Sequence, residues 1–170
     1  MAVPLAEINA LDEAAFSARL GGIYEHSPWV AQRAWPRRPF ASVQALQAAM
    51  QDALIAAQPS EQLTLIRAHP ELAGRLAIAG QLTEASRSEQ SAAGLNQCTP
   101  EEFAQLQALN AAYRAKFGFP FIVAVRGLTR AGIIGAMRRR LDNTIDEERA
   151  ASLREIGRIA QLRLQDLIED

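Results

Sequence analysis

Apolar residues recur at steps of three and four in several stretches of the chain, which is the spacing of side chains on one face of an α-helix. The clearest early case falls at Val43, Leu46, Met50 and Leu54. Ser42 stands directly before it and has the short hydroxyl side chain favoured at a helix N-cap. A helix is therefore predicted from residue 43, with its apolar face turned towards a core.

A shorter helix is predicted to start near Ser60, with Leu63 and Ile66 on its apolar side. It runs towards His69 and ends there, because Pro70 disfavours helical geometry in the residue before it.

The next strong helix start lies at Thr99. Thr99 is a cap residue, Pro100 occupies the first helical position and Glu102 closes a capping box. This helix is predicted to end near Gly118. Its apolar face is formed by Phe103, Leu106, Leu109 and Tyr113.

Thr144 and Glu147 repeat the capping-box pattern and open the last helix. The face predicted to pack inward carries Leu153, Ile156, Ala160, Leu164 and Leu167. The face predicted to point largely to water carries Arg149, Arg154, Glu155 and Arg158.

One stretch, FPFIVAV at residues 119–125, has the composition of a strand. No second convincing strand is present to pair with it, and an isolated strand would leave its backbone groups unsatisfied. We therefore predict an extended segment near 118–126 threaded among helices. The fold class is all-α, and with no linker or internal repeat residues 1–170 are expected to form a single compact helical domain.

Composition and net charge limit the classes of binding partner that we expect. The net charge of −1 gives no bulk reason to expect nucleic acid or an anionic membrane. The basic run Arg138, Arg139 and Arg140 is read as a solvated helix end, because acidic residues follow it. No stretch reaches the length of a membrane span, and the first residues lack the features of a signal peptide, so a cytoplasmic protein is expected.

Metal chemistry is poorly supported by two histidines, one cysteine and no paired-ligand spacing, so no metal site is expected. Cys98 is interpreted as a loop residue before the Thr99 helix start, with a nucleophilic role as the alternative. His26 lies beside Trp29 and is expected to make a structural hydrogen bond.

His69 and the serine-rich run that starts at Ser86 are the remaining candidates for chemistry. From spacing alone, His69 is more simply explained as satisfying the last carbonyls of its helix. Ser86 and Glu89 match a capping box, so a plain helix start is the simplest interpretation of that run. The functional alternative is an anion bound by amides at the helix N-terminus.

A binding module without catalysis is a competing hypothesis. Its basis is the cluster of Trp29, Trp35 and Phe40 with Arg33, Arg37 and Arg38 between them, which is more often a core edge with a solvated rim. A third hypothesis is another lyase or an amidohydrolase acting on a different ureido compound.

The order of motifs resembles one family. The motifs are GGIYEHSPWV at 21–30, RPF at 38–40, HPELAG at 69–74, SRSEQSAAGL at 86–95 and a run from Asn110 through KFGFPFI at 116–122. Each is weak alone, but together and in this order they resemble the 2-oxo-4-hydroxy-4-carboxy-5-ureidoimidazoline (OHCU) decarboxylase family. The match runs from about residue 16 to the last helix.

The resemblance implies an all-helical homodimer without a metal or organic cofactor, which converts OHCU to (S)-allantoin during urate degradation. It implies that His69 and Glu89 are catalytic and leaves Arg126 as a possible partner of the substrate carboxylate. The substrate contacts that it implies are Pro70, Ser86, Arg87, Ser88, Glu89, Gln90, Phe121, Ile122, Val123, Ala124 and Val125.

Overall fold

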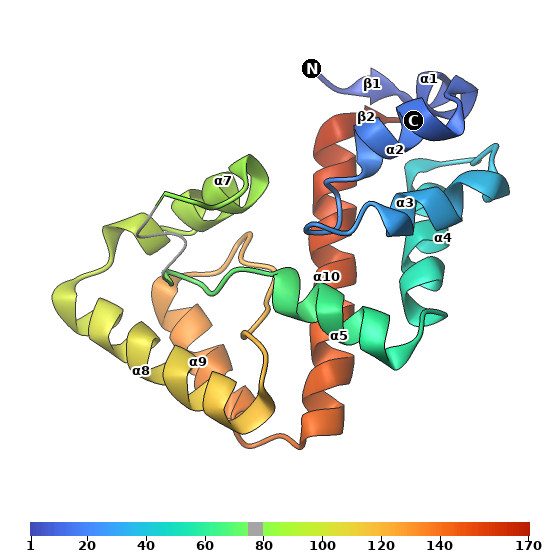
Figure 1. Cartoon of the computed structure of the whole chain (residues 1–170). Coiled ribbons are helices and arrows are strands. Elements are labelled where there is room, and N and C mark those ends of the chain that lie inside the picture. Colours follow the sequence, from blue (N-terminus) through green and yellow to red (C-terminus); the bar gives the residue numbers. More distant parts are fainter. Residues whose placement is uncertain (75–79) are drawn as a thin grey trace. The chain divides into compact units, whose positions relative to one another are not determined.

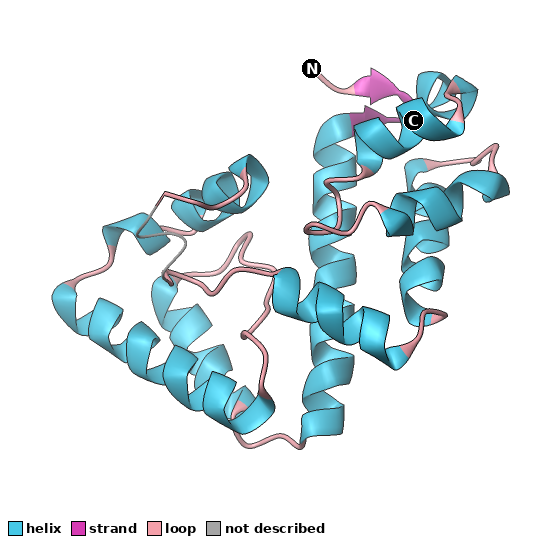
Figure 2. Cartoon of the chain, in the orientation of Figure 1, coloured by secondary structure: helices cyan, strands magenta, loops and turns pink. Residues whose placement is uncertain are grey.

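The computed structural model describes residues 1–74 and 80–170, and helices dominate them (Figures 1 and 2). The α-helices are α1 (Leu5–Ala10), α2 (Glu13–Leu20), α3 (Trp29–Ala34), α4 (Val43–Ile55), α5 (Pro59–Ala68), α7 (Glu84–Ala92), α8 (Pro100–Phe117), α9 (Arg130–Arg140) and α10 (Ile145–Leu167). The 3₁₀ turns are η1 (Trp35–Arg37) and η2 (Leu95–Gln97). The prediction of an all-α protein is confirmed.

A pair of two-residue strands is the only sheet among the described residues. β1 (Val3–Pro4) pairs in parallel with β2 (Ile168–Glu169), with Val3 opposite Ile168. This pairing ties the N-terminal residues to the end of α10, so the two ends of the described chain lie side by side (Figure 2).

The described residues divide into two compact units, one made of 1–68 and 156–170 and the other of 69–155. The first contains α1 to α5 and the second half of α10. Its core includes Phe16, Leu46, Met50 and Leu164, each fully buried. The expectation of one domain over 1–170 stays a prediction.

The second unit, residues 69–155, contains α7, α8, α9 and the first half of α10. An aromatic cluster forms part of its core. Tyr113 lies 4.6 Å from Phe117 and 5.4 Å from Phe121, centroid to centroid. Phe119 also contacts this group, with its ring 6.0 Å from that of Tyr113. All the residues expected to bind substrate belong to this unit.

Local hydrogen bonding explains why the predicted helices begin where they do. Ser42 Oγ accepts from the amide of Ala45 at the start of α4. Thr99 and Glu102 exchange the two bonds of a capping box at α8, and α8 ends before Gly118 with φ of 76°. Thr144 and Glu147 exchange the same pair of bonds before α10. These sequence predictions are confirmed.

The exposure of two side chains, those of Phe103 and Glu155, differs from the prediction. Phe103 was expected on the buried face of α8, but it is 38% exposed and lies in the wall of a pocket. Glu155 was expected to face water, but it is half-buried and accepts a hydrogen bond from the Ala124 amide at 2.9 Å.

The tryptophan–arginine cluster is a core edge with a solvated rim. The Arg33 guanidinium lies 4.4 Å from the Trp29 ring centre and pairs with Glu61. Trp35 Nε1 donates to the Leu11 carbonyl oxygen at 3.2 Å. Because these groups already have partners within the same unit, the cluster gives no support to a separate binding surface.

Candidate active site

His69 directly follows α5 and is only 7% exposed. Pro70 follows it, as the prediction of a helix end required. The imidazole therefore stands in a packed environment at the start of an irregular loop, residues 69–74.

Side chains from two helices hold this loop. Gln90 of α7 accepts from the Ala73 amide at 3.0 Å and donates to the Glu71 carbonyl oxygen at 3.4 Å. The Glu71 carboxylate in turn pairs with Arg114 of α8 at 2.8 Å. Gln90 thus satisfies buried backbone groups of the loop, a role that the sequence reasoning did not foresee.

Helix α8 supplies two further bonds to the same loop. Gln107 donates to the Ala73 carbonyl oxygen at 2.8 Å, and Asn110 donates to the Leu72 carbonyl oxygen at 3.0 Å. Asn110 is a buried polar residue one turn after the buried Leu106. The sequence does contain a signal for this role of Asn110, because a polar side chain on the apolar face of a helix needs a hydrogen-bond partner when it is buried.

Ala73 has a positive φ of 50°, a left-handed conformation that costs a non-glycine residue roughly 1–2 kcal/mol. Both of its backbone polar groups are bonded, to Gln90 and Gln107. The surrounding contacts therefore hold the loop in a conformation that Ala73 alone would not favour.

The serine-rich run lies within α7, not at its start. Thr83 is the N-cap and its hydroxyl accepts from the amide of Ser86. The predicted capping box between Ser86 and Glu89 is therefore wrong, because the helix begins one turn earlier. Glu89 is half-buried in the body of α7 and does not cap it.

The five residues of the run lie on different sides of α7. Ser86 and Gln90 are buried, and Arg87 and Ser88 are exposed. Since residues four apart share a helix face, Ser86 and Gln90 form its inward side, towards the loop that follows His69.

The segment 121–125 has neither helix nor strand, as predicted. Four of its five residues are buried, and only Val123 is half-exposed. The Ile122 carbonyl oxygen accepts from Arg140 Nη1 at 2.6 Å, and the Ala124 amide donates to Glu155. Side chains thus supply the partners that a neighbouring strand would otherwise supply.

Arg140 belongs to a buried network that the sequence reasoning missed. Its Nε donates to both oxygens of the fully buried Glu148, at 2.8 and 3.0 Å. Tyr113 donates to the same carboxylate at 3.0 Å. The Arg140 guanidinium also lies 4.4 Å from the Phe121 ring centre.

The interpretation of Arg138, Arg139 and Arg140 as a solvated helix end is therefore wrong for Arg140. The first two side chains are exposed, but the third is turned inward to Glu148. Glu148 lies on α10, eight residues further along the chain, and its ion pair with Arg140 explains why this one arginine turns away from the solvent.

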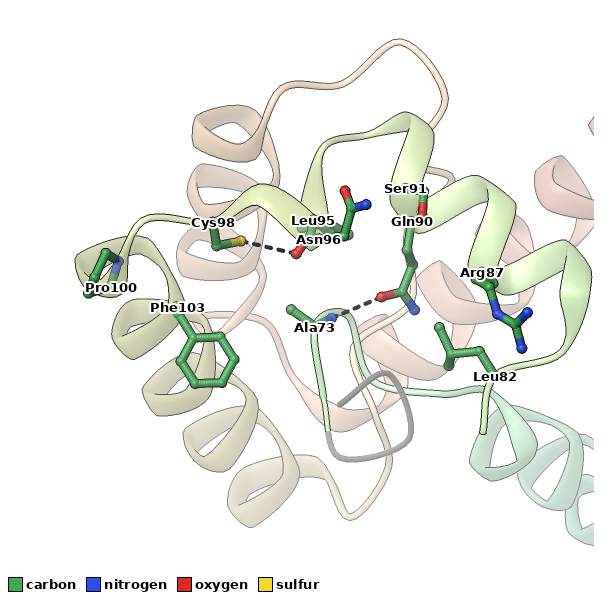
Figure 3. Close-up of a pocket in the computed structure, with 10 residues that line it drawn as sticks. All are labelled: Ala73, Leu82, Arg87, Gln90, Ser91, Leu95, Asn96, Cys98, Pro100 and Phe103. Atoms are coloured by element: carbon green, nitrogen blue, oxygen red, sulfur yellow. Dashed lines mark hydrogen bonds between the residues drawn. The ribbon is translucent and has the colours of Figure 1, made fainter. Parts of the chain in front are cut away.

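A pocket of about 480 Å³ lies beside α7 (Figure 3). Arg87 and Gln90 are the two predicted substrate contacts among its lining residues. The remaining walls are largely apolar and include Leu95 and the exposed ring of Phe103. His69 and Glu89 are not among the described residues that line it.

Cys98 also lines this pocket, and its Sγ donates to the Leu95 carbonyl oxygen at 3.3 Å (Figure 3). Burial and the nearby Glu102 raise the pKa of the thiol, while Arg130 opposes them. A raised pKa lowers the thiolate fraction and with it nucleophilicity. The interpretation of Cys98 as a loop residue fits this environment better.

His26, expected to make a structural hydrogen bond, and Arg126, considered as a partner of the substrate carboxylate, both have exposed side chains. His26 has a positive φ of 47° in the turn before α3. Across residues 1–74 and 80–170, no cluster of three or more histidine, cysteine or acidic side chains is suited to a metal ion. No helix in the same ranges has the length and apolarity needed to cross a membrane.

Comparisons with known proteins agree on one family. The OHCU decarboxylase family model matches residues 9–165. The OHCU decarboxylase of Haloferax volcanii is 43% identical over 162 residues, which cover 95% of this chain and 94% of that protein. The OHCU decarboxylase of Halalkalicoccus jeotgali is 41% identical over 161 residues, covering 95% of this chain and 89% of the relative.

A solved structure of an (S)-allantoin synthase superposes with a TM-score of 0.79 and 29% sequence identity. The match covers 98% of this chain and 54% of the other, so this chain corresponds to about half of that protein.

Proposed function

The chain belongs to the OHCU decarboxylase family, and on that premise we propose that it decarboxylates OHCU to (S)-allantoin, with His69 and Glu89 in catalytic roles. The observation that carries the proposal is the family match along nearly the whole chain. The loop after His69, tied down by Gln90, Gln107 and Asn110, supports a defined position for the imidazole.

The substrate carries a hydroxyl and a carboxylate on one ring carbon, next to a ring imine. When the bond to the carboxylate breaks, its electron pair flows into the imine, whose nitrogen takes up a proton. The substrate thus provides its own electron sink, which is why we propose that no organic cofactor is needed. The resulting enol then loses its hydroxyl proton and gains one at the neighbouring carbon. Overall, one carbon dioxide leaves and one proton is taken up.

We assign these proton transfers to His69, because an imidazole titrates near neutral pH and can both accept and donate. It accepts the hydroxyl proton and delivers a proton to one face of the ring carbon. Delivery to one face gives the S product, whereas the uncatalysed reaction gives a racemate.

Glu89 is proposed to bind N–H groups of the substrate or to stabilise the imidazolium. Glu89 is half-buried in the body of α7, which partly withdraws its carboxylate from water. Pro70, the run Ser86–Gln90 and the segment 121–125 are proposed to enclose the flat substrate and to limit water. We further propose that the chain forms a homodimer and acts in the cytoplasm. Sedimentation analysis of the purified protein would test the homodimer.

The decisive test is His69→Asn with the chain's other histidine as control. Freshly oxidised urate supplies OHCU, ultraviolet absorbance follows its loss, and circular dichroism follows the optically active product. We expect His69→Asn to lose about a hundred- to ten-thousand-fold in rate, the usual contribution of positioned acid–base catalysis. His26→Asn should keep the wild-type rate, because His26 is exposed and asparagine tolerates its positive φ. A His69→Asn enzyme that forms (S)-allantoin at the wild-type rate would refute the assignment.

Glu89→Gln tests the acidic residue, and Glu84→Gln on the exposed side of α7 is its matched control. We expect a slow but folded Glu89→Gln enzyme and an active Glu84→Gln enzyme. Equal activity of the two variants would remove Glu89 from the mechanism.

A further inference from the structure

The segment 121–125 is buried without a neighbouring strand, so its position depends on a few side chains. Two bonds hold its middle: Arg140 Nη1 to the Ile122 carbonyl oxygen at 2.6 Å, and the Ala124 amide to Glu155 Oε2 at 2.9 Å. The donor comes from α9 and the acceptor from α10. Because the two bonds hold Ile122 and Ala124, they restrict both the position of the segment and its rotation about its own axis.

Both bonds depend on acids that lie on one face of α10. Glu148 and Glu155 are seven residues apart, which places them on the same side of a helix. Glu148 orients Arg140 through two bonds, and Glu155 bonds the segment directly. Glu155 bonds the segment directly, whereas Glu148 acts through Arg140. Glu155 is half-buried, whereas Glu148 is fully buried. Glu155 can therefore be changed without leaving a buried arginine unpaired.

The two bonds also suggest an expectation for the backbone groups of the residue between them. Residues 121–125 form no helix, strand, turn or bend, and their composition predicts an extended backbone. In an extended chain, the polar groups of alternate residues point to the same side and those of the residue between them point to the opposite side. With the Ile122 carbonyl bonded to Arg140 and the Ala124 amide bonded to Glu155, we expect the N–H and C=O of Val123 to point to the other side. An adjacent donor and acceptor of this kind match the N–H and C=O of a ureido or ring amide group.

We infer that Glu155 is a positioning residue for the decarboxylation: through the Ala124 amide it sets the register in which segment 121–125 meets the substrate. This inference rests on the proposed function. Glu155 takes no part in proton transfer. Its loss lets the segment shift, and a displacement of about 1 Å can cost a hundredfold in rate.

The experiment compares Glu155→Ala, Glu155→Gln and, as control, Arg154→Ala, which changes the exposed neighbour on the same helix. Glutamine keeps an oxygen that can accept from Ala124, and alanine does not. We expect kcat/KM to fall about ten- to a hundredfold in Glu155→Ala. We expect Glu155→Gln to stay within about threefold of wild type, since one neutral hydrogen bond replaces a charged one.

The enantiomeric excess of allantoin separates positioning from simple loss of folded enzyme. Each variant is assayed at the concentration that gives the same acceleration over the uncatalysed reaction. A smaller folded fraction then leaves the excess of the S product unchanged, whereas a shifted segment lowers it. We expect a lower excess in Glu155→Ala, restored in Glu155→Gln.

Each outcome has a distinct meaning. If the wild-type chain does not accelerate OHCU loss, the proposed function fails and this inference fails with it. If wild type is active and Glu155→Ala keeps its kcat/KM and its enantiomeric excess, the positioning role alone is wrong. The same conclusion follows if alanine and glutamine variants are impaired equally.

Discussion

Replacing Glu148 by glutamine removes one charge from the buried Arg140–Glu148 ion pair while preserving the shape of the side chain. The Glu148 side chain is 0% exposed and that of Arg140 is 15% exposed. Glutamine can still accept from Tyr113, but it cannot offer Arg140 a negative charge. The guanidinium is then left largely buried without its counter-charge.

The expected loss follows from these contacts. Breaking a fully buried pair by removing one partner typically costs about 3–5 kcal/mol. Arg140 keeps its bond to the Ile122 carbonyl oxygen, its contact with the Phe121 ring and some exposure, so we expect a loss of about 2–4 kcal/mol. For a chain of this size that corresponds to a fall in Tm of roughly 5–15 °C.

Urea unfolding followed by circular dichroism measures the change in the free energy of unfolding. Glu147→Gln is the matched control, because Glu147 is exposed and a glutamine can still close the capping box with Thr144. A double-mutant cycle with Arg140→Met and Glu148→Met isolates the pair, and we expect a coupling of roughly 2 kcal/mol. A Glu148→Gln protein within about 1 kcal/mol of wild type, together with negligible coupling, would refute this reasoning.

Two further predictions concern Ala73 and the tyrosines. Ala73→Gly should raise the free energy of unfolding by about 1 kcal/mol in urea, since glycine adopts a φ of 50° without strain; lower stability would show that the methyl group packs usefully. Burial raises the pKa of both Tyr113 and Tyr24 above the ordinary value. Their protonated forms stabilise the fold fully below about pH 10, and this contribution is lost as pH rises further, by up to about 1.4 kcal/mol per unit for each group. Tyr113→Phe should halve this alkaline slope in urea unfolding, and an unchanged slope would contradict the burial argument.

Local signals in the sequence were sufficient for the starts of α4, α8 and α10 and for the end of α8. The hydroxyl of Ser42, the capping boxes at Thr99 and Thr144, and Gly118 after α8 each act over three or four residues. Such bonds form wherever the local chain is helical, so they can be read without knowing what lies across the fold. The failed capping box at Ser86 shows the limit, because Thr83 offered the same chemistry one turn earlier.

The candidate site was predicted through the order of its motifs, which marks the family and so indicates His69 and Glu89. The side chains that hold the backbone of that site in place could not be predicted in this way. Arg140 and Glu155 carry no local feature that distinguishes them from solvated neighbours, and Gln90 was expected to contact substrate.

The chain by itself therefore determined the helices α4, α5, α8 and α10, the unpaired segment 121–125 and the family. Only the tertiary structure decided which polar side chains turn inward. A buried backbone group must find a hydrogen-bond partner, and the partner is whichever side chain the packing of distant helices brings within reach. For Ile122 and Ala124 those partners lie 18 and 31 residues further along the chain, on α9 and α10.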